Sequence, residues 1–308
     1  MKKVFIDGSA GTTGLRIAER LEERKDIQLI KLTEENRKDI SARKQALNEA
    51  DIAFLCLPDK ASVEAVALTE NTNTVLLDTS TAHRTNPEWT YGFPELSAGQ
   101  KKKIANSKRI AVPGCHASGV IALVYPLIES GILPKESLLS AISLTGYSGG
   151  GKGMIAEYES LEREELLDAP RQYGIAQCHK HLPEIVNVTG LENAPLFMPI
   201  VADYYSGMEV TVPLFASAIN GSVEDIKNVY KNKYNGPIVN YKEDFSEDGF
   251  ISANKLSFKD GMEISVSGNS ERILLIARYD NLGKGASGAA IQCMNLVLGI
   301  NETTGLNV

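Results

Sequence analysis

Asp7-Gly-Ser-Ala-Gly-Thr-Thr-Gly14 is the stretch of this sequence that decides its fold. It separates an apolar run at residues 3–7, typical of a strand, from an amphipathic run at residues 13–24 that predicts a helix. A Gly-x-x-Gly-x-x-Gly loop between a strand and a helix is typical of dinucleotide-binding folds. We therefore expect a parallel, doubly wound sheet to begin here.

The three glycines of this loop have separate expected roles. Gly8 permits the tight turn, Gly11 lets the backbone approach a pyrophosphate, and Gly14 lets the helix pack close to the sheet. A strand-to-helix turn without a ligand is the simpler interpretation. The other predicted cofactor contacts in the loop are Ser9, Thr12 and Thr13.

Strand and helix patterns alternate through the first third of the 308-residue chain, which predicts α/β architecture. The later strands are predicted at 27–32, 51–57, 74–78 and 109–112, and the helices at 40–49 and 61–69. This length is enough for two domains. We expect a nucleotide-binding domain at 1–114, an α+β domain at 115–284, and a C-terminal helix at about 285–308 that packs back on the first domain.

The end of the second predicted strand bears on the choice of cofactor. NAD enzymes of this kind usually carry an acid there, which binds the ribose 2′-hydroxyl. Here no acid stands at the strand end, and Lys31, Arg37 and Lys38 could meet a 2′-phosphate instead. NADP is therefore favoured over NAD, although Glu34 and Glu35 are near enough to reverse this preference.

Val112-Pro-Gly-Cys-His-Ala-Ser-Gly119 places a cysteine on a turn just before a predicted helix at 119–130. The unpaired N–H groups and positive dipole end of a helix favour a thiolate, so Cys115 is a candidate nucleophile. A small buried hydrophobic residue is the alternative. Cys56 and Cys293 lie in apolar runs typical of a protein core, and disulfides are not expected.

A nucleophilic cysteine normally works with a base, for which histidine is the usual choice. His116 is adjacent to Cys115, but neighbouring side chains at a helix start usually point apart. His179 and His181 would share one face if their segment is extended, and Glu184 could orient a ring. No second ligand pair is present to complete a metal site, so none is expected; two surface histidines without a role remain the alternative.

The second half of the chain has a mixed pattern. Strands are predicted at 138–145, 207–219, 264–267 and 272–279, and helices at 155–167, 223–234 and 284–298. Such long strands suit a sheet interface with a second subunit. Gly146-Tyr-Ser-Gly-Gly-Gly-Lys152 is typical of an anion-binding nest, but it lacks the spacing of a nucleotide-hydrolysing P-loop.

The composition narrows the classes of partner. A net charge of −7 gives no electrostatic reason to expect nucleic acid or an anionic membrane. No apolar run is long enough for a signal peptide or a bilayer span, so we expect a cytoplasmic protein that binds a small molecule.

The chain resembles the N-acetyl-γ-glutamyl-phosphate reductase family, in particular its shorter subgroup, within the wider group of aspartate-semialdehyde and glyceraldehyde-phosphate dehydrogenases. The resemblance covers nearly the whole chain, although the sequence of the first glycine loop differs from the family's commoner form at Ala10 and Thr12. It is carried by the motifs Gly8–Gly14, Asp78-Thr-Ser-Thr-Ala-His-Arg84, Tyr91-Gly-Phe-Pro-Glu-Leu96, Pro113–Gly119, Gly146–Lys152, His179-Lys-His-Leu-Pro-Glu-Ile185 and Asp280-Asn-Leu-Gly-Lys-Gly-Ala-Ser-Gly288.

The resemblance implies reduction of N-acetylglutamyl 5-phosphate with NADPH to the semialdehyde and phosphate, in arginine biosynthesis. It implies a Cys115 thioester, proton transfer by His181 or His179, and a homodimer or homotetramer. Implied substrate contacts are Arg84, Ser148, Gly149, Lys152 and Glu184, and implied cofactor contacts include Ser80, Asn281 and Gly283. The rival interpretations are an aspartate-semialdehyde dehydrogenase, a reductase of a carrier-bound aminoacyl phosphate, and a non-catalytic NADP-binding module.

Overall fold

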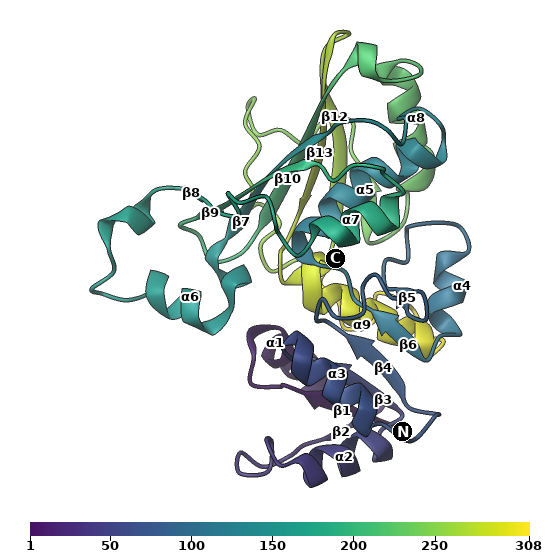
Figure 1. Ribbon diagram of the computed structural model, residues 1–308, viewed down its shortest axis with the longest axis vertical. Coiled ribbons are helices and arrows are strands. Elements are labelled where there is room, and N and C mark those ends of the chain that lie inside the picture. The colour runs from purple at the N-terminus through teal and green to yellow at the C-terminus, as the bar shows by residue number, and fades with distance from the viewer. The chain divides into compact units, whose positions relative to one another are not determined.

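The computed structural model describes all 308 residues, which form two compact units (Figure 1). Unit 1 contains residues 1–114 and 286–306, and unit 2 contains residues 115–285 and 307–308.

Unit 1 is built on a six-stranded sheet in the order β2-β1-β3-β4-β6-β5, in which every pairing is parallel. The predicted doubly wound parallel sheet is therefore confirmed. Its strands are β1 (Lys2–Asp7), β2 (Ile27–Ile30), β3 (Ile52–Leu55), β4 (Val75–Asp78), β5 (Thr90–Tyr91) and β6 (Arg109–Ala111).

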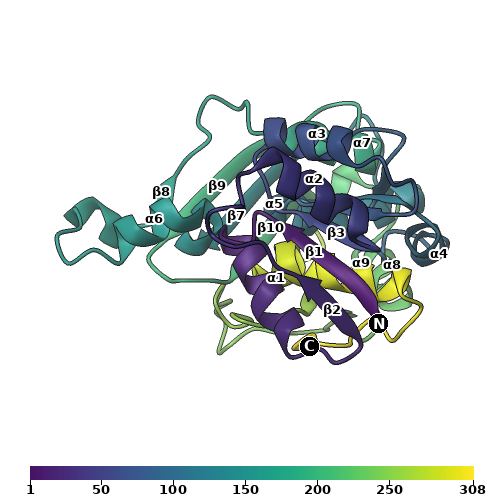
Figure 2. The ribbon, with the colours of Figure 1, turned by 90° about the horizontal axis from the view of Figure 1, so that it is seen from below.

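Helices cover both faces of this sheet, because successive strand residues point to opposite sides. Val4 of β1 packs in one core with α1 (Thr12–Glu22) and α9 (Gly288–Val297), whereas Phe5 packs in a second core with α2 (Ile40–Glu49) and α3 (Asp59–Leu68). Figure 2 shows α2 and α3 together on one side of β1 and β3. The short helix α4 (Gln100–Ala105) packs against α9.

Unit 2 is built on a seven-stranded mixed sheet in the order β11-β12-β13-β10-β7-β9-β8. Helix α5 (Cys115–Glu129) lies on one face of it, against β10 and β13, and α7 (Leu182–Thr189) and α8 (Val223–Lys233) pack beside α5. The strands are β7 (Ser140–Gly146), β8 (Arg171–Gln172), β9 (Leu196–Ala202), β10 (Met208–Phe215), β11 (Val239–Tyr241), β12 (Met262–Gly268) and β13 (Arg272–Tyr279).

Helix α5 approaches its sheet unusually closely. A Cβ at Gly119 would lie 2.6 Å from the Tyr279 hydroxyl and 2.6 Å from a methyl group of Val210. Most residues of α5 are buried, as expected for a helix that is apolar on all sides. The first turn of α5 is therefore held against the sheet of unit 2.

Several predicted boundaries were wrong. Helix α5 begins at Cys115, four residues before the expected start, so the cysteine is inside the first turn. Helix α6 (Gly151–Tyr158) ends well before residue 167; Leu161, in the turn that follows it, is fully exposed and contributes no buried apolar contact to a longer helix. Helix α7 was not predicted, although Pro183 in its first turn and Gly190 after its last are ordinary boundary signals.

Candidate functional site

The glycine loop of unit 1 has the geometry of a phosphate-binding turn. Gly8 has φ +88°, and a Cβ there would overlap with the carbonyl oxygen of Cys56. A Cβ at Gly14 would overlap with the carbonyl oxygen of Gly8, so α1 starts directly on the loop. At Gly11 the nearest atom to a Cβ would be 3.5 Å away, which leaves the backbone accessible from outside.

The start of α1 offers unsatisfied donors to a ligand. Its N-cap, Gly11, has no side chain to cap the first turn. The hydroxyl of Thr12 is buried and has no hydrogen-bond partner. A helix start with free N–H groups and a positive dipole end is an anion site, so this loop fits a dinucleotide pyrophosphate.

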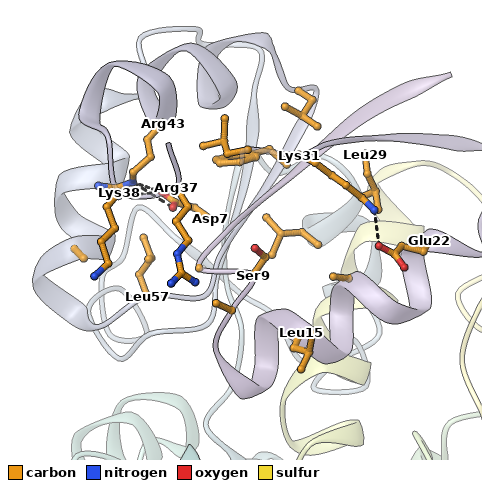
Figure 3. A pocket seen from close by; sticks show the side chains of 18 residues that line it. Asp7, Ser9, Leu15, Glu22, Leu29, Lys31, Arg37, Lys38, Arg43 and Leu57 are labelled. Carbon is orange, nitrogen blue, oxygen red and sulfur yellow. Dashed lines mark hydrogen bonds and ion pairs between the residues drawn. The ribbon is translucent and has the colours of Figure 1, made fainter. Parts of the chain in front are cut away.

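A cavity of about 540 Å³ lies beside the loop, and Figure 3 shows the side chains that line it. Its basic side chains differ in their partners. Lys31 donates to Glu22 at 2.5 Å, and Arg43 holds the buried Asp7 through contacts of 3.0–3.2 Å.

Arg37 and Lys38 lie on the same side of this cavity, away from Lys31 (Figure 3). Arg37 pairs with Glu34, a partly exposed contact of 2.6 Å. Lys38 has no ion pair or hydrogen bond to the protein. Lys38 is therefore the basic group of the cavity that is available to an added anion.

In unit 2, Cys115 is the first residue of α5, where the helix dipole favours a thiolate. Its carbonyl oxygen accepts a hydrogen bond of 2.6 Å from the Tyr279 hydroxyl, which itself accepts one from the N–H of Gly119. A Cβ at Gly285 would lie 3.1 Å from the Cβ of Cys115. Tyr279 and Gly285 were not predicted; only the glycine-rich run 283–288 hinted at a close approach.

Three histidines form what we call the histidine cluster around His116, the residue that follows Cys115 in the chain: His116, His179 and His181, with the rings of Tyr173 and Phe197. The ring centroids of His179 and His181 are 4.8 Å apart, and both lie 5.5–5.7 Å from that of His116. The expectation of an extended segment was wrong. His181 is the helical N-cap of α7, and its N–H donates to Nδ1 of His179 at 3.2 Å.

His116 is neutral at physiological pH. Burial, with smaller contributions from the charges of His179 and Lys180, lowers its pKa to about 3. Its Nδ1 lies 2.7 Å from the Ser143 hydroxyl and its Nε2 lies 2.6 Å from the Tyr173 hydroxyl. Both ring nitrogens are engaged, so His116 does not serve Cys115 as a base. Burial also lowers the pKa of His179.

The buried His116 predicts acid sensitivity of the fold. The pKa of His116 in the folded protein is below the unfolded value of about 6.5. As the pH falls, this ring therefore becomes protonated in the unfolded chain before it does so in the folded protein. Stability is complete above pH 6.5 and falls as the pH drops toward 3, by up to about 1.4 kcal/mol per pH unit for this group. We expect His116→Gln to flatten this fall. Urea unfolding of both proteins at pH 7, 5.5 and 4.5 measures it, and equal slopes would contradict the assignment.

The predicted anion nest at 146–152 is only partly available. The N–H groups of Gly146, Tyr147 and Ser148 donate to carbonyl oxygens of the segment 204–207. The buried Ser148 hydroxyl accepts from Asn281 Nδ2 at 3.0 Å, and Asn281 Oδ1 accepts from the Gly207 N–H. Gly149 and Lys152, in the same loop, are exposed. Asn281 thus ties two loops together.

The other predicted ligand residues take part in the framework of each unit. In unit 1, Arg84 is buried and donates to the carbonyl oxygens of Val112 and Thr79. Ser80 donates twice to Asp78, through its N–H and its hydroxyl. In unit 2, a Cβ at Gly283 would overlap with the Lys259 carbonyl oxygen, and Glu184 is buried in the first turn of α7.

Two further properties of the chain concern metals and membranes. No group of three or more His, Cys, Asp or Glu side chains is arranged to hold a metal ion. No helix combines the length and the apolar composition that crossing a bilayer requires.

Comparison with known proteins identifies both units. Family models described as "Semialdehyde dehydrogenase, NAD binding domain" and "Semialdehyde dehydrogenase, dimerisation domain" match residues 3–104 and 115–281. N-acetyl-gamma-glutamyl-phosphate reductase of Trichormus variabilis is 42% identical, over 99% of both chains, and that of Brucella anthropi is 45% identical, over 96% of this chain and 98% of its own length.

A solved structure, aspartate semialdehyde dehydrogenase from Francisella tularensis, is similar in fold, with a TM-score of 0.72 over 97% of this chain and 100% of that chain. Its sequence is 13% identical, so this similarity concerns the fold alone. The predicted two-part architecture of the semialdehyde dehydrogenases is confirmed.

Proposed function

This chain belongs to the N-acetyl-γ-glutamyl-phosphate reductase family of the semialdehyde dehydrogenases, and from that premise we infer how its residues carry out the reaction. The reaction is the NADPH-dependent reductive dephosphorylation of N-acetylglutamyl 5-phosphate to N-acetylglutamate 5-semialdehyde, in arginine biosynthesis. The observation that carries the proposed mechanism is the position of Cys115, in the first turn of α5 and beside the histidine cluster.

In the first step, the Cys115 thiolate attacks the acyl carbonyl carbon, a C–S bond forms, and the C–O bond to phosphate breaks. Phosphate leaves with the electron pair, and a thioester remains on Cys115. N–H groups at the start of α5 stabilise the negative oxygen of the tetrahedral intermediate, an effect of about 3 kcal/mol per donor. In unit 2, the exposed Gly149 and Lys152 bind the anionic groups of the substrate, and the buried Ser148 and Glu184 hold their segments of that unit in position.

In the second step, the bound coenzyme supplies the hydride that reduces the thioester. Collapse of the resulting thiohemiacetal releases the aldehyde and returns the electron pair to sulfur. We assign proton transfer to His181, which is buried beside Glu184 at the start of α7. His179 has its Nδ1 engaged by the His181 N–H, and we assign it to the anionic end of the substrate.

NADP(H) fits unit 1 through the residues already described. The loop Gly8–Gly14, with the hydroxyls of Ser9, Thr12 and Thr13, would hold the pyrophosphate. Arg37 and Lys38 would hold the 2′-phosphate, since they lie on one side of the cavity and Lys38 has no partner. Ser80 is a further proposed cofactor contact in unit 1, where its hydroxyl donates to Asp78. Asn281 and Gly283, the cofactor contacts that the resemblance implies in unit 2, hold loops of that unit in position.

Lys38→Ala is expected to raise KM for NADPH by about 10- to 100-fold, which corresponds to the loss of one charged hydrogen bond of 1.5–3 kcal/mol. KM for NADH should change little, because NADH has no 2′-phosphate. Lys31→Ala is the matched control, since Lys31 already pairs with Glu22. Steady-state kinetics with both coenzymes measure the effects. A larger effect in Lys31→Ala, or a wild-type preference for NADH, would contradict the assignment.

The direct test of the function is turnover of the wild-type protein. Phosphate-dependent reduction of NADP⁺ should be fast with N-acetylglutamate 5-semialdehyde and slow with aspartate semialdehyde. A reversed preference would support the aspartate-semialdehyde interpretation instead. No turnover with either aldehyde, together with a Cys115 that is inert to a thiol reagent at neutral pH, would indicate a non-catalytic module.

The protein assembles into oligomers through unit 2, its dimerisation domain. We propose that the protein is cytoplasmic. We also propose that it forms a homodimer through the face of the unit 2 sheet that lies opposite α5. On that face Phe215, Leu274 and Leu196 are exposed by 66%, 39% and 63%. Leu274 lies opposite Pro213 in register, between Ile273 and Leu275, which are buried toward the helices. Burying such apolar side chains favours association.

Leu274→Glu is therefore expected to convert the dimer to a monomer, because it would place a charge in the buried face. Sedimentation velocity of the variant and the wild-type protein measures the change. An exposed substitution on α8, Glu224→Gln, serves as the control. A wild-type tetramer that Leu274→Glu leaves intact would show that another surface is used.

A further inference from the structure

The segment 173–181, which carries His179 and His181, contains no helix or strand, and residues 175–178 are exposed. Loops of this kind are usually the mobile parts of a protein. A general acid must nevertheless be held within hydrogen-bond reach of the reacting atoms. The side-chain contacts of this segment show how it is held.

The first contact joins the start of the segment to the helix of the nucleophile. Nε2 of His116, on α5, lies 2.6 Å from the Tyr173 hydroxyl. Nδ1 of the same ring lies 2.7 Å from the hydroxyl of Ser143, which is fully buried on β7. The buried His116 ring therefore connects three elements: the first turn of α5, strand β7 and the segment that carries the histidines.

The second contact joins the middle of the segment to β9. The backbone pairs with β9 at Arg171 and Gln172 and then turns away. Further along, the Gln177 side chain makes the two hydrogen bonds to the β9 backbone that a neighbouring strand would otherwise make. Its Nε2 donates to the carbonyl oxygen of Phe197 at 2.8 Å, and its Oε1 accepts from the N–H of Phe197 at 2.9 Å.

The backbone of Gln177 is consistent with a constrained position. Its φ of +55° is uncommon for a residue other than glycine. Such a backbone conformation persists where the surrounding contacts hold it in place. The ring of Phe197 packs 5.0 Å from that of His179 and 5.4 Å from that of His116. Gln177 thus connects the turn before His179 to a residue that already touches the histidine cluster.

We propose that His116 and Gln177 are positioning residues, which hold the segment 173–181 so that His179 and His181 face Cys115. This inference rests on the proposed roles of Cys115 and His181. Neither residue transfers a proton: His116 has both nitrogens engaged, and the Gln177 amide does not titrate. A displacement of about 1 Å of a catalytic group can lower the rate about 10²-fold, so loss of either contact should affect kcat.

The test uses a matched pair of variants on the full-length protein. Gln177→Glu removes the donor to the Phe197 carbonyl oxygen, and Gln172→Glu makes the same chemical change at an exposed position of β8 that makes no side-chain hydrogen bond. We expect kcat to fall 10- to 100-fold in Gln177→Glu, with KM for NADPH within twofold of wild type. Gln172→Glu should match the wild-type protein in both constants.

His116 is tested with two variants. His116→Phe keeps a ring but loses both hydrogen bonds, and we expect a 10- to 100-fold fall in kcat. His116→Gln can still donate and accept, so it should recover part of the lost rate. Thermal unfolding of each variant is measured in parallel. A lower melting temperature with kcat unchanged would indicate a merely structural role and overturn the proposal.

Alkylation of Cys115 by iodoacetamide at pH 7, followed by mass spectrometry of its peptide, provides a readout that needs no substrate. We expect Gln177→Glu and His116→Phe to slow it about tenfold, because the histidines no longer face the thiol. Slower alkylation in a protein that does not turn over N-acetylglutamyl phosphate would support positioning and contradict the proposed substrate. Wild-type alkylation rates and kcat in Gln177→Glu would overturn the positioning role even if His116→Phe fails to fold.

Discussion

Cys115→Ser is expected to lower kcat at least about 10⁴-fold, while the Kd of NADPH changes less than twofold. A serine hydroxyl is almost entirely protonated at pH 7, and the start of α5 cannot convert it to an alkoxide as it converts a thiol to a thiolate. Loss of a covalent nucleophile therefore removes the thioester route altogether. Stopped-flow measurement of NADPH oxidation and fluorescence titration of NADPH provide the two constants.

The control for this substitution is Cys178→Ser, which should retain most of the activity. Cys178 is exposed and its thiol donates only to the carbonyl oxygen of Ala176. It is also adjacent to His179 in sequence, which makes it the appropriate cysteine for comparison. If Cys178→Ser were inactive and Cys115→Ser active, the assignment of the nucleophile would be wrong.

His181→Asn is expected to lower kcat by about 10²–10⁴, with a modest change in KM, as is usual when a general acid–base group is lost. His181 is buried at the start of α7, where Pro183 restricts the backbone and Glu184 lies in the same turn. His179→Asn should mainly raise KM for the acyl phosphate. Steady-state kinetics of the two variants at saturating NADPH measure both effects.

The same two variants can also contradict the assignment of proton transfer to His181. A collapse of kcat confined to His179→Asn would move proton transfer to His179. Near-normal kcat in both variants would remove the histidine cluster from the chemistry. Because the rings of His179 and His181 are only 4.8 Å apart, the double variant should be made as well, since neighbouring groups rarely act additively.

Local patterns were enough to predict the parallel sheet and the candidate nucleophile. The roles of Gly8 and Gly14 follow from the strand–loop–helix pattern around them, and the structure shows why a side chain would not fit at either position. Cys115 was found because a Pro-Gly turn before an apolar helix is itself a local signal. Such signals act over one turn of chain, so one sequence is sufficient to read them.

The surroundings of Cys115 could not be predicted in this way. Tyr279 contacts it from 164 residues further along the chain, and Gly285 approaches it from the turn after β13. The extended geometry expected for His179 and His181 was wrong because α7 begins at this point and packs against α5. These contacts depend on which strands pair and which helices pack, and a local pattern contains no information about that.

The basic side chains of the cofactor cavity also show which features the sequence predicts and which depend on the tertiary structure. Their charge and their place after β2 are readable from the sequence, and they favour a 2′-phosphate. Which of them is available is not readable, because Lys31 pairs with Glu22 across nine residues and Arg43 with Asp7 across 36. Only the folded chain brings those carboxylates within 2.5–3.2 Å of the two cations, and so leaves Lys38 without a partner.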